Sequence, residues 1–140
     1  MKNADTLFLQ LKEKVPSDSY AAFKQSLDEA EDSQFDALLL ISYKNPILAL
    51  IFSVIVPGVD RIYKGDVALG VFKLIFVCVI YATFNFYIDK ADQLQTGVFI
   101  ILCVLAIIAF IWVVSDIFLV YKGVKKDNLR KIFEVLQRKQ

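Results

Sequence analysis

The first third of the chain repeats apolar residues at three- and four-residue intervals, the spacing of helices with one buried face. The apolar stripes consist of Leu7, Phe8, Leu11 and Val15 in one segment, and of Tyr20, Phe23, Leu27 and Ala30 in the next. A third helix is expected from Ser33, which suits a helix N-terminus, and Asn45-Pro46 ends the region. Such stripes are typical of packing surface, with a partner-binding groove as the alternative.

Three apolar runs follow, over residues 47–59, 67–88 and 97–120. The third contains nineteen consecutive uncharged residues, Gly97–Ser115, close to the roughly 20 needed to cross a bilayer. The second is of similar length, and we expect both to span. The first run has thirteen residues, a length more typical of re-entrant segments, although a span is the alternative.

The polar stretches complete the pattern. A compact charged segment occupies residues 60–66, and a polar one occupies residues 89–96. The tail, residues 122–140, has the spacing of a basic amphipathic helix with Leu129 and Ile132 on its apolar face. That face suits either an anionic membrane surface or packing on the chain's own N-terminal helices.

The pattern therefore predicts an all-α integral membrane protein. It would consist of a short apolar helix and a hydrophobic helical hairpin, with amphipathic soluble helices at both ends. The expected domains are an N-terminal helical region over residues 1–45, a membrane domain over 46–121 and a C-terminal helix over 122–140.

Charge sets the expected orientation. The formal net charge is +1, which gives no global field to attract nucleic acid. The segment 121–140 carries seven Lys and Arg against two acids, so the C-terminus is expected in the cytoplasm and residues 89–96 outside. The side of the N-terminus depends on whether the first apolar run spans the membrane. The five lysines in residues 1–46 favour the cytoplasmic side.

The composition does not indicate a catalytic site or a metal site. The chain has no His, which removes the commonest general base and the usual zinc ligand sets. Cys78 and Cys103 each lie in an apolar run, and buried small side chains are their simplest interpretation. We therefore expect no enzyme, no metal site and no cofactor.

Lys73 and Asp116 are charges within the long apolar segments, where a charge is costly and usually paired. Lys73 follows Asp66 by seven residues and Asp116 precedes Lys122 by six, so the two lie at matching depths on antiparallel helices. We expect an interhelical ion pair. Snorkelling of Lys73 to water or lipid phosphate, or an ion pathway, are the alternatives.

Several segments resemble the TM-two domain family. They are Lys44–Ser53, Pro57–Asp66 with its Asp-Arg-Ile-Tyr-Lys-Gly-Asp sequence, Gly70–Ile75, and Ile111-Trp112 with Asp116. The resemblance implies two transmembrane helices around an Asp-Arg-Phe-type loop and, with the N-terminal helical region, a multi-pass protein of the bacterial cytoplasmic (inner) membrane. Most members have no assigned biochemical function.

Two departures limit the resemblance. Ile62 replaces the motif's Phe, and 37 residues separate Leu74 from Trp112, more than the family pattern implies. The two-helix topology of the family therefore does not transfer directly to this chain.

The motif residues Asp60, Arg61, Tyr63 and Gly65 suit a helix-connecting turn at the headgroup level, or else a recognition site for a protein partner. Arg61 could contact lipid phosphates or helix carbonyls, and Asp60 could pair with Arg61, Lys64 or Lys73. Tyr63 suits an interfacial position, and Trp112 is either an interface anchor or a core residue.

The sequence thus predicts a non-enzymatic membrane scaffold or interaction module, acting through its cytoplasmic helices and the Asp60–Gly65 loop. Its expected partners are the lipid bilayer, anionic lipid at the tail, and a protein partner or a second copy. A subunit of an oligomeric small channel or transporter is the alternative.

Overall fold

The computed structural model describes residues 4–88 and 96–137, and every regular element in these residues is a helix. This confirms the all-α prediction for the described part of the chain. The chain divides into two units, one built from residues 1–46 and 121–140 and the other from residues 47–120.

The first unit is a small bundle with its own core. It contains α1 (Ala4–Leu11), α2 (Tyr20–Asp28), α3 (Asp32–Leu40), two short 3₁₀ turns (Lys12–Lys14 and Ser17–Ser19) and the C-terminal part of α7 (Thr96–Leu136). Its buried core consists of Leu7, Leu11, Val15, Phe23, Leu27, Ala30, Phe35, Leu38 and Ile132. The predicted stripes supply most of these side chains.

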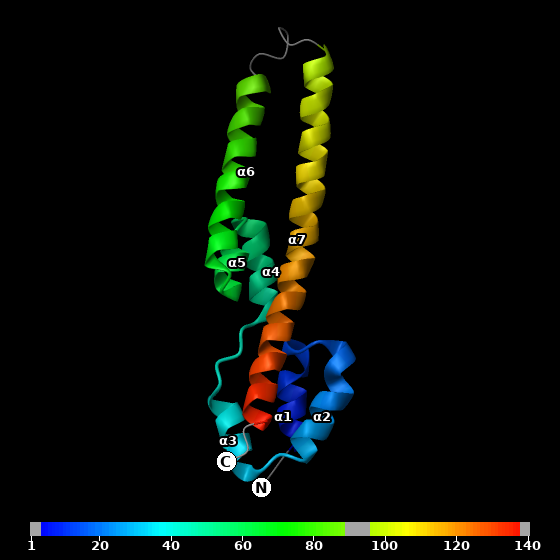
Figure 1. The fold of residues 1–140 in the computed structure, drawn as a ribbon, viewed down its shortest axis with the longest axis vertical. Coiled ribbons are helices and arrows are strands. Elements are labelled where there is room, and N and C mark those ends of the chain that lie inside the picture. The colour runs from blue at the N-terminus through cyan, green and yellow to red at the C-terminus, as the bar shows by residue number, and fades with distance from the viewer. Residues whose placement is uncertain (1–3, 89–95, 138–140) are drawn as a thin grey trace. The chain divides into compact units, whose positions relative to one another are not determined.

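The tail packs on the N-terminal helices, which was one of its two expected roles. Ile132 is fully buried in the core, and Leu129 and Leu136 pack at its edge. Segments near both ends of the chain therefore contribute to one hydrophobic core, and Figure 1 shows the C-terminal part of α7 in red beside α1 in blue.

The start of the third helix differs from the prediction. Glu31, not Ser33, is the N-cap. Its side chain accepts a hydrogen bond from the backbone N–H of Gln34, and Gln34 Oε1 accepts one from Glu31 N–H at 2.9 Å. A Glu-x-x-Gln pair thus caps the helix two residues before the position expected from Ser33.

The second unit begins with two short helices, α4 (Pro46–Ile55) and α5 (Val59–Lys64). Helix α4 has ten residues, about 15 Å at 1.5 Å per residue, against a hydrocarbon core of about 30 Å. The charged segment expected to be a loop is instead helical over Val59–Lys64, and Gly65 ends it with φ 114°. Its acidic residue in the first turn and basic residues in the last match the helix dipole.

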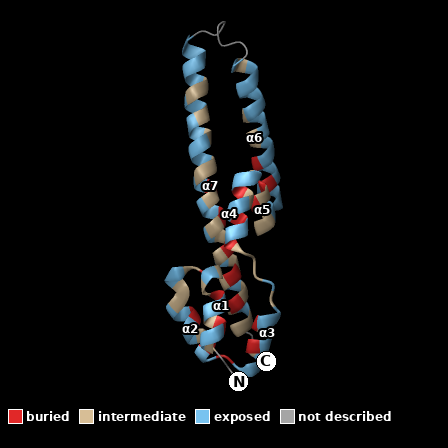
Figure 2. Cartoon of the chain, turned by 180° about the vertical axis from the view of Figure 1, so that it is seen from behind, coloured by how far each residue is buried: buried red, intermediate tan, exposed pale blue. Residues whose placement is uncertain are grey.

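Helix α6 (Val67–Ile88) and helix α7 are both long and apolar enough to cross a membrane. Their apolar side chains are mostly exposed, as the pale blue ribbons of α6 and of the N-terminal part of α7 show in Figure 2. Phe110, for example, is 70% exposed. Exposed apolar surface of this extent is typical of a membrane-facing or protein-facing surface.

The predicted membrane helix ending at residue 120 and the predicted tail helix from 122 form one continuous helix, α7, although the two units divide between residues 120 and 121. Gly123 is the nearest weak helix former, and one glycine costs only about 1 kcal/mol. The expected outer loop, residues 89–96, lies outside the described residues except for Thr96, which begins α7.

Candidate functional site: a buried charge cluster

Five polar side chains from four helices meet inside the second unit and form what we name the charge cluster. Its members are Ser53 of α4, Asp60 and Arg61 of α5, Lys73 of α6 and Asp116 of α7. Asp60, Lys73 and Asp116 are 0%, 1% and 4% exposed. Two acids and two bases make the cluster electrically neutral.

Lys73 is the centre of the charge cluster. Its Nζ lies 2.7 Å from Asp60 Oδ2 and 2.7 Å from Asp116 Oδ2. The structure thus brings Lys73 and Asp116 together, and it adds Asp60 as a second carboxylate on the same ammonium. The side chain is buried among its partners and does not snorkel.

Asp60 has three partners. Its Oδ2 accepts hydrogen bonds from Lys73 Nζ and from Ser53 Oγ, the latter at 2.8 Å, and its Oδ1 accepts one from Gly58 N–H at 2.9 Å. A carboxylate with this many donors can remain charged when buried. Asp60 of α5 therefore connects this helix to both α4, through Ser53, and α6, through Lys73.

The Arg61 guanidinium binds carboxylates in the structure. Nε donates to Asp116 Oδ2 at 3.3 Å and Nη2 donates to Asp116 Oδ1, which is the two-pronged geometry that suits Arg and carboxylate. Nη1 donates to Asp66 Oδ2 at 3.3 Å. The hydrogen bond to Asp116 raises the pKa of Arg61, against the opposing effect of burial.

Asp66 lies at the edge of the charge cluster and also accepts a hydrogen bond from Lys64 Nζ at 2.7 Å. This bond lowers the pKa of Asp66, and the Arg61 guanidinium adds to the effect. Asp66 is one-third exposed, so the pair contributes little stability by itself.

The backbones of Gly58 and Gly70 touch, and this contact lets α5 lie against α6. A Cβ on Gly70 would lie 2.6 Å from both Gly58 O and Ile62 Cγ1, and a Cβ on Gly58 would lie 2.4 Å from Gly70 O. Gly58 also has φ 105°, a conformation that disfavours other residues. Since Lys73 follows Gly70 by one helical turn, this approach sets the Asp60–Lys73 distance.

The remaining predicted residues have structural contacts. The Tyr63 ring packs edge-on against Phe52 of α4 at 5.4 Å between centroids. Trp112 is 41% exposed and packs edge-on against Phe76 of α6 at 5.2 Å. The contact joins α6 and α7 just beyond Asp116, so Trp112 has an interhelical partner.

Sequence reasoning missed Ser53 and the pairing of Arg61 with Asp116. Ser53 was visible as an isolated hydroxyl in an apolar run, but nothing in its spacing names Asp60 as its partner. It also gave no structural role to Asn128, which is buried in the first unit and joins distant backbone segments. Asn128 Oδ1 accepts from Lys44 N–H, and Nδ2 donates to Lys14 O and Lys44 O.

Two general properties limit the chemistry of the charge cluster. Within residues 4–88 and 96–137, every buried side-chain nitrogen and oxygen has a hydrogen-bond partner. The same residues contain no group of His, Cys, Asp and Glu that could hold a metal ion. The geometry is that of a closed structural network, with its polar atoms occupied by one another.

Comparisons with protein families, with curated proteins and with solved structures found no match to this chain.

Proposed function

We propose that this protein is a non-enzymatic multi-pass membrane protein whose soluble helical unit serves as a scaffold or interaction module. The observation that carries the proposal is the shared core of the first unit, where Leu7 from one end of the chain and Ile132 from the other are buried together. A chain whose ends share one core has both ends on one side of a membrane.

The shared core also favours two spans over three. With both ends on one side, the number of crossings is even, and α6 and the apolar part of α7 supply two. Helix α4, at about 15 Å, then enters the bilayer without crossing it. The Lys- and Arg-rich tail places this side in the cytoplasm by the positive-inside rule.

We also propose membership of the TM-two domain family and a place in the bacterial cytoplasmic membrane. Support comes from the motif residues: Asp60, Arg61, Lys73 and Asp116, which are distant in sequence, meet in the charge cluster. The motif then serves to lock the membrane helices together.

The interaction role belongs to the soluble helices in this proposal, since Asp60 is fully buried and Arg61 is committed to carboxylates. The C-terminal turn of α3 is a suitable contact surface, because Leu39 and Leu40 are 64% and 87% exposed there. The closed hydrogen bonding of the charge cluster disfavours the alternative of an ion pathway.

Topology provides the first test. Cysteines introduced as Asp5→Cys, Asp92→Cys and Val135→Cys, in a chain with Cys78 and Cys103 replaced by alanine, are labelled in intact cells with a membrane-impermeant maleimide. We expect label at position 92 and none at positions 5 and 135 until the cells are opened. Label at position 5 but not at 135 would contradict the two-span arrangement.

The interaction role needs a separate test. A photo-crosslinking amino acid at position 40 should yield one discrete product in cells, and the same probe at the exposed position 25 should not. The product should disappear when Leu39→Asp is added. Identical products from positions 25 and 40 would count against α3 as a contact surface.

A further inference from the structure

A pocket of about 460 Å³ lies in the first unit, between the last turns of α1 and α3. Leu7, Leu11 and Leu38 of its lining belong to the buried core of this unit, so the inner part of the pocket is apolar. Its volume falls within the roughly 300–1,000 Å³ of typical ligand sites. The pocket is thus large enough to receive side chains of another molecule.

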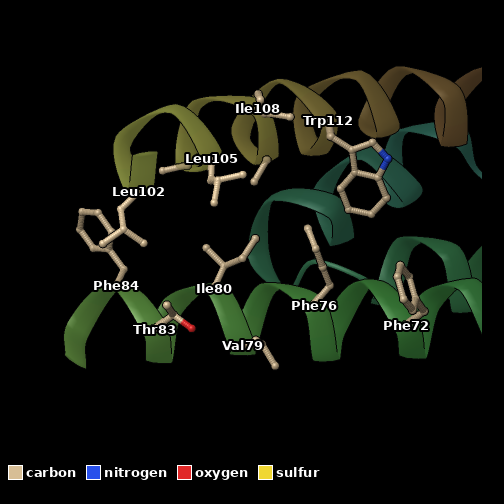
Figure 3. Close-up of a pocket in the computed structure, with 12 residues that line it drawn as sticks. Phe72, Phe76, Val79, Ile80, Thr83, Phe84, Leu102, Leu105, Ile108 and Trp112 are labelled. Atoms are coloured by element: carbon tan, nitrogen blue, oxygen red, sulfur yellow. The ribbon is translucent and has the colours of Figure 1, made fainter. Parts of the chain in front are cut away.

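Polar side chains in the lining set this pocket apart. The Nζ of half-buried Lys14 lies 5.7 Å from the centroid of the Tyr43 ring, and within residues 4–88 and 96–137 it forms no ion pair. The Gln10 amide, also in the lining, forms no hydrogen bond in this part of the chain. Figure 3 shows a second pocket, between α6 and α7, whose lining is almost entirely apolar and selects no occupant by charge.

The charge near the Lys14 pocket is positive, which selects an anion. Lys131 Nζ donates to the carbonyl of Ser42, which lies between two lining residues, at 3.2 Å. The Asn128 amide binds the carbonyls of both Lys14 and Lys44, so these lysines are close in space. A carboxylate on the Lys14 ammonium would form a charge-assisted hydrogen bond, about twice as strong as a neutral one.

Exposed leucines beside the pocket favour a protein segment over a small free anion. Leu39 lines the pocket and Leu40 follows it, and both are mostly exposed. A small anion would satisfy Lys14 but would leave these leucines in water. A protein segment can place a carboxylate on Lys14 and cover the leucines at the same time.

We infer that this pocket binds a protein segment in which an acidic side chain lies next to a large aliphatic one. The inference rests on the proposed interaction role of α3 and names the chemistry of its partner. The carboxylate pairs with Lys14 and accepts a hydrogen bond from Gln10. The aliphatic side chain enters the apolar inner part of the pocket.

Peptide titration of the full-length protein in detergent tests this chemistry. The probe is the tetrapeptide glycine-glutamate-leucine-glycine, blocked at both ends and followed by NMR through the side-chain amide signal of Gln10. We expect a shift that saturates, and binding at least about tenfold weaker when lysine replaces glutamate in the peptide. A shift without saturation, or equal affinity for the two peptides, would overturn the inference.

Charge variants provide the second arm. Lys14→Glu should weaken binding of the glutamate peptide at least about tenfold, which corresponds to about 1.4 kcal/mol. Lys126→Glu is the matched control, because Lys126 is an exposed lysine of α7 outside the lining. Lys14→Gln removes the charge without reversing it and should give an intermediate loss. Equal losses in the Lys14→Glu and Lys126→Glu variants would contradict a site at Lys14.

An anionic membrane surface is the competing occupant. Phosphatidylglycerol added to the detergent micelles should leave the Gln10 signal in place while the glutamate peptide shifts it. The opposite result would assign the positive charge to lipid and overturn the inference.

Crosslinking in cells separates this inference from the proposed function. The product from position 40 should disappear in Lys14→Glu and persist in Lys126→Glu. If position 40 yields no discrete product in the unaltered chain, both the interaction role of α3 and the pocket inference fail. A product that persists in Lys14→Glu overturns the pocket inference alone.

Discussion

At the scale of single residues, Lys73 holds the charge cluster together, because its ammonium bridges Asp60 and Asp116. A buried ammonium between two carboxylates is stable only while all three are present, because removal of one leaves an uncompensated charge. The Arg61 guanidinium then supplies the fourth charge and occupies the remaining side of Asp116. The cluster is thus a coupled set and not a simple pair.

Replacing Lys73 with methionine should destabilise the protein by about 3–5 kcal/mol, because Asp60 and Asp116 lose their shared ammonium. The measurement is reversible unfolding in detergent micelles. Lys64→Met is the matched control and should cost at most about 1 kcal/mol, since Lys64 pairs at the edge with partly exposed Asp66. Equal losses would contradict a central role for Lys73.

The cluster also changes the outcome expected of a charge exchange. For an isolated pair, combining Lys73→Asp with Asp116→Lys would restore stability. Here the exchange places a carboxylate beside Asp60 and an ammonium beside Arg61, so the double variant should remain as poorly folded as either single one. Recovery of membrane-protein yield would show that the Lys73–Asp116 contact acts alone.

Tyr43 gives the first unit a pH dependence. Burial raises the pKa of Tyr43 to about 12, from about 10 in an unfolded chain. The unfolded state then loses its proton first as pH rises. The stabilising contribution is complete below pH 10 and declines between about pH 10 and 12.

Thermal unfolding across this pH range should therefore show a decline that Tyr43→Phe reduces. The variant also loses the hydrogen bond from the Tyr43 hydroxyl to Leu38 O, so its stability below pH 10 should be lower. An unchanged slope above pH 10 in Tyr43→Phe would assign the decline to other groups.

At the scale of elements, the contact between Gly58 and Gly70 determines how α5 meets α6. The two backbones approach so closely that neither position has room for a Cβ. This contact sets the register in which Asp60 of α5 reaches Lys73 of α6. Gly58 thus permits the close approach of α5 to α6, and Asp60, two residues later, forms its ion pair with Lys73 across that contact.

Gly70→Ala should destabilise the second unit by about 1–3 kcal/mol, the usual cost of inserting a carbon into a packed contact. Gly97→Ala is the matched control, because a Cβ at Gly97 meets nothing within 4 Å. It should be neutral or slightly stabilising, since alanine is the better helix former. Unfolding midpoints of the two variants compare the effects directly, and similar midpoints would contradict the close approach.

At the scale of the whole molecule, one helix serves both units. The apolar part of α7 belongs with α4, α5 and α6, and its polar end completes the core of α1, α2 and α3. Both chain ends therefore enter one fold, although 100 residues or more separate Leu7 from Ile132. Asn128 reinforces this closure by binding the backbone of Lys14 and of Lys44.

Asn128→Ala should destabilise the first unit by about 1–3 kcal/mol or more, because it leaves Lys44 N–H and two carbonyls without their side-chain partner. Asn85→Ala is the control: its amide is exposed and bonds only the Tyr81 carbonyl one turn away. Proteolysis at native pH should cleave the Asn128→Ala variant faster within residues 1–46. Equal protection in the two variants would argue against this closure.

Much of the architecture follows from pattern alone. Amphipathic spacing identified most of the core side chains of the N-terminal helices, and the apolar lengths of 67–88 and 97–120 identified two helices long and apolar enough to cross a membrane. Helix boundaries were harder to predict from the sequence. The segment 60–66 is charged enough to resemble a loop, but its acid lies in the first turn and its bases in the last turn, an arrangement that stabilises a helix through its dipole. The helix continues through the junction near residue 121 because a change from apolar to basic residues does not interrupt helical hydrogen bonds.

The sequence by itself determined what is set by local composition and period: helix content, the apolar lengths, and the presence of costly charges among apolar residues. Tertiary structure alone decided which of those charges meet, because they lie on α5, α6 and α7, of which α5 and α6 are brought together by a glycine contact. It also decided that the tail closes on the N-terminal helices, since an amphipathic face specifies burial but not the surface that provides it.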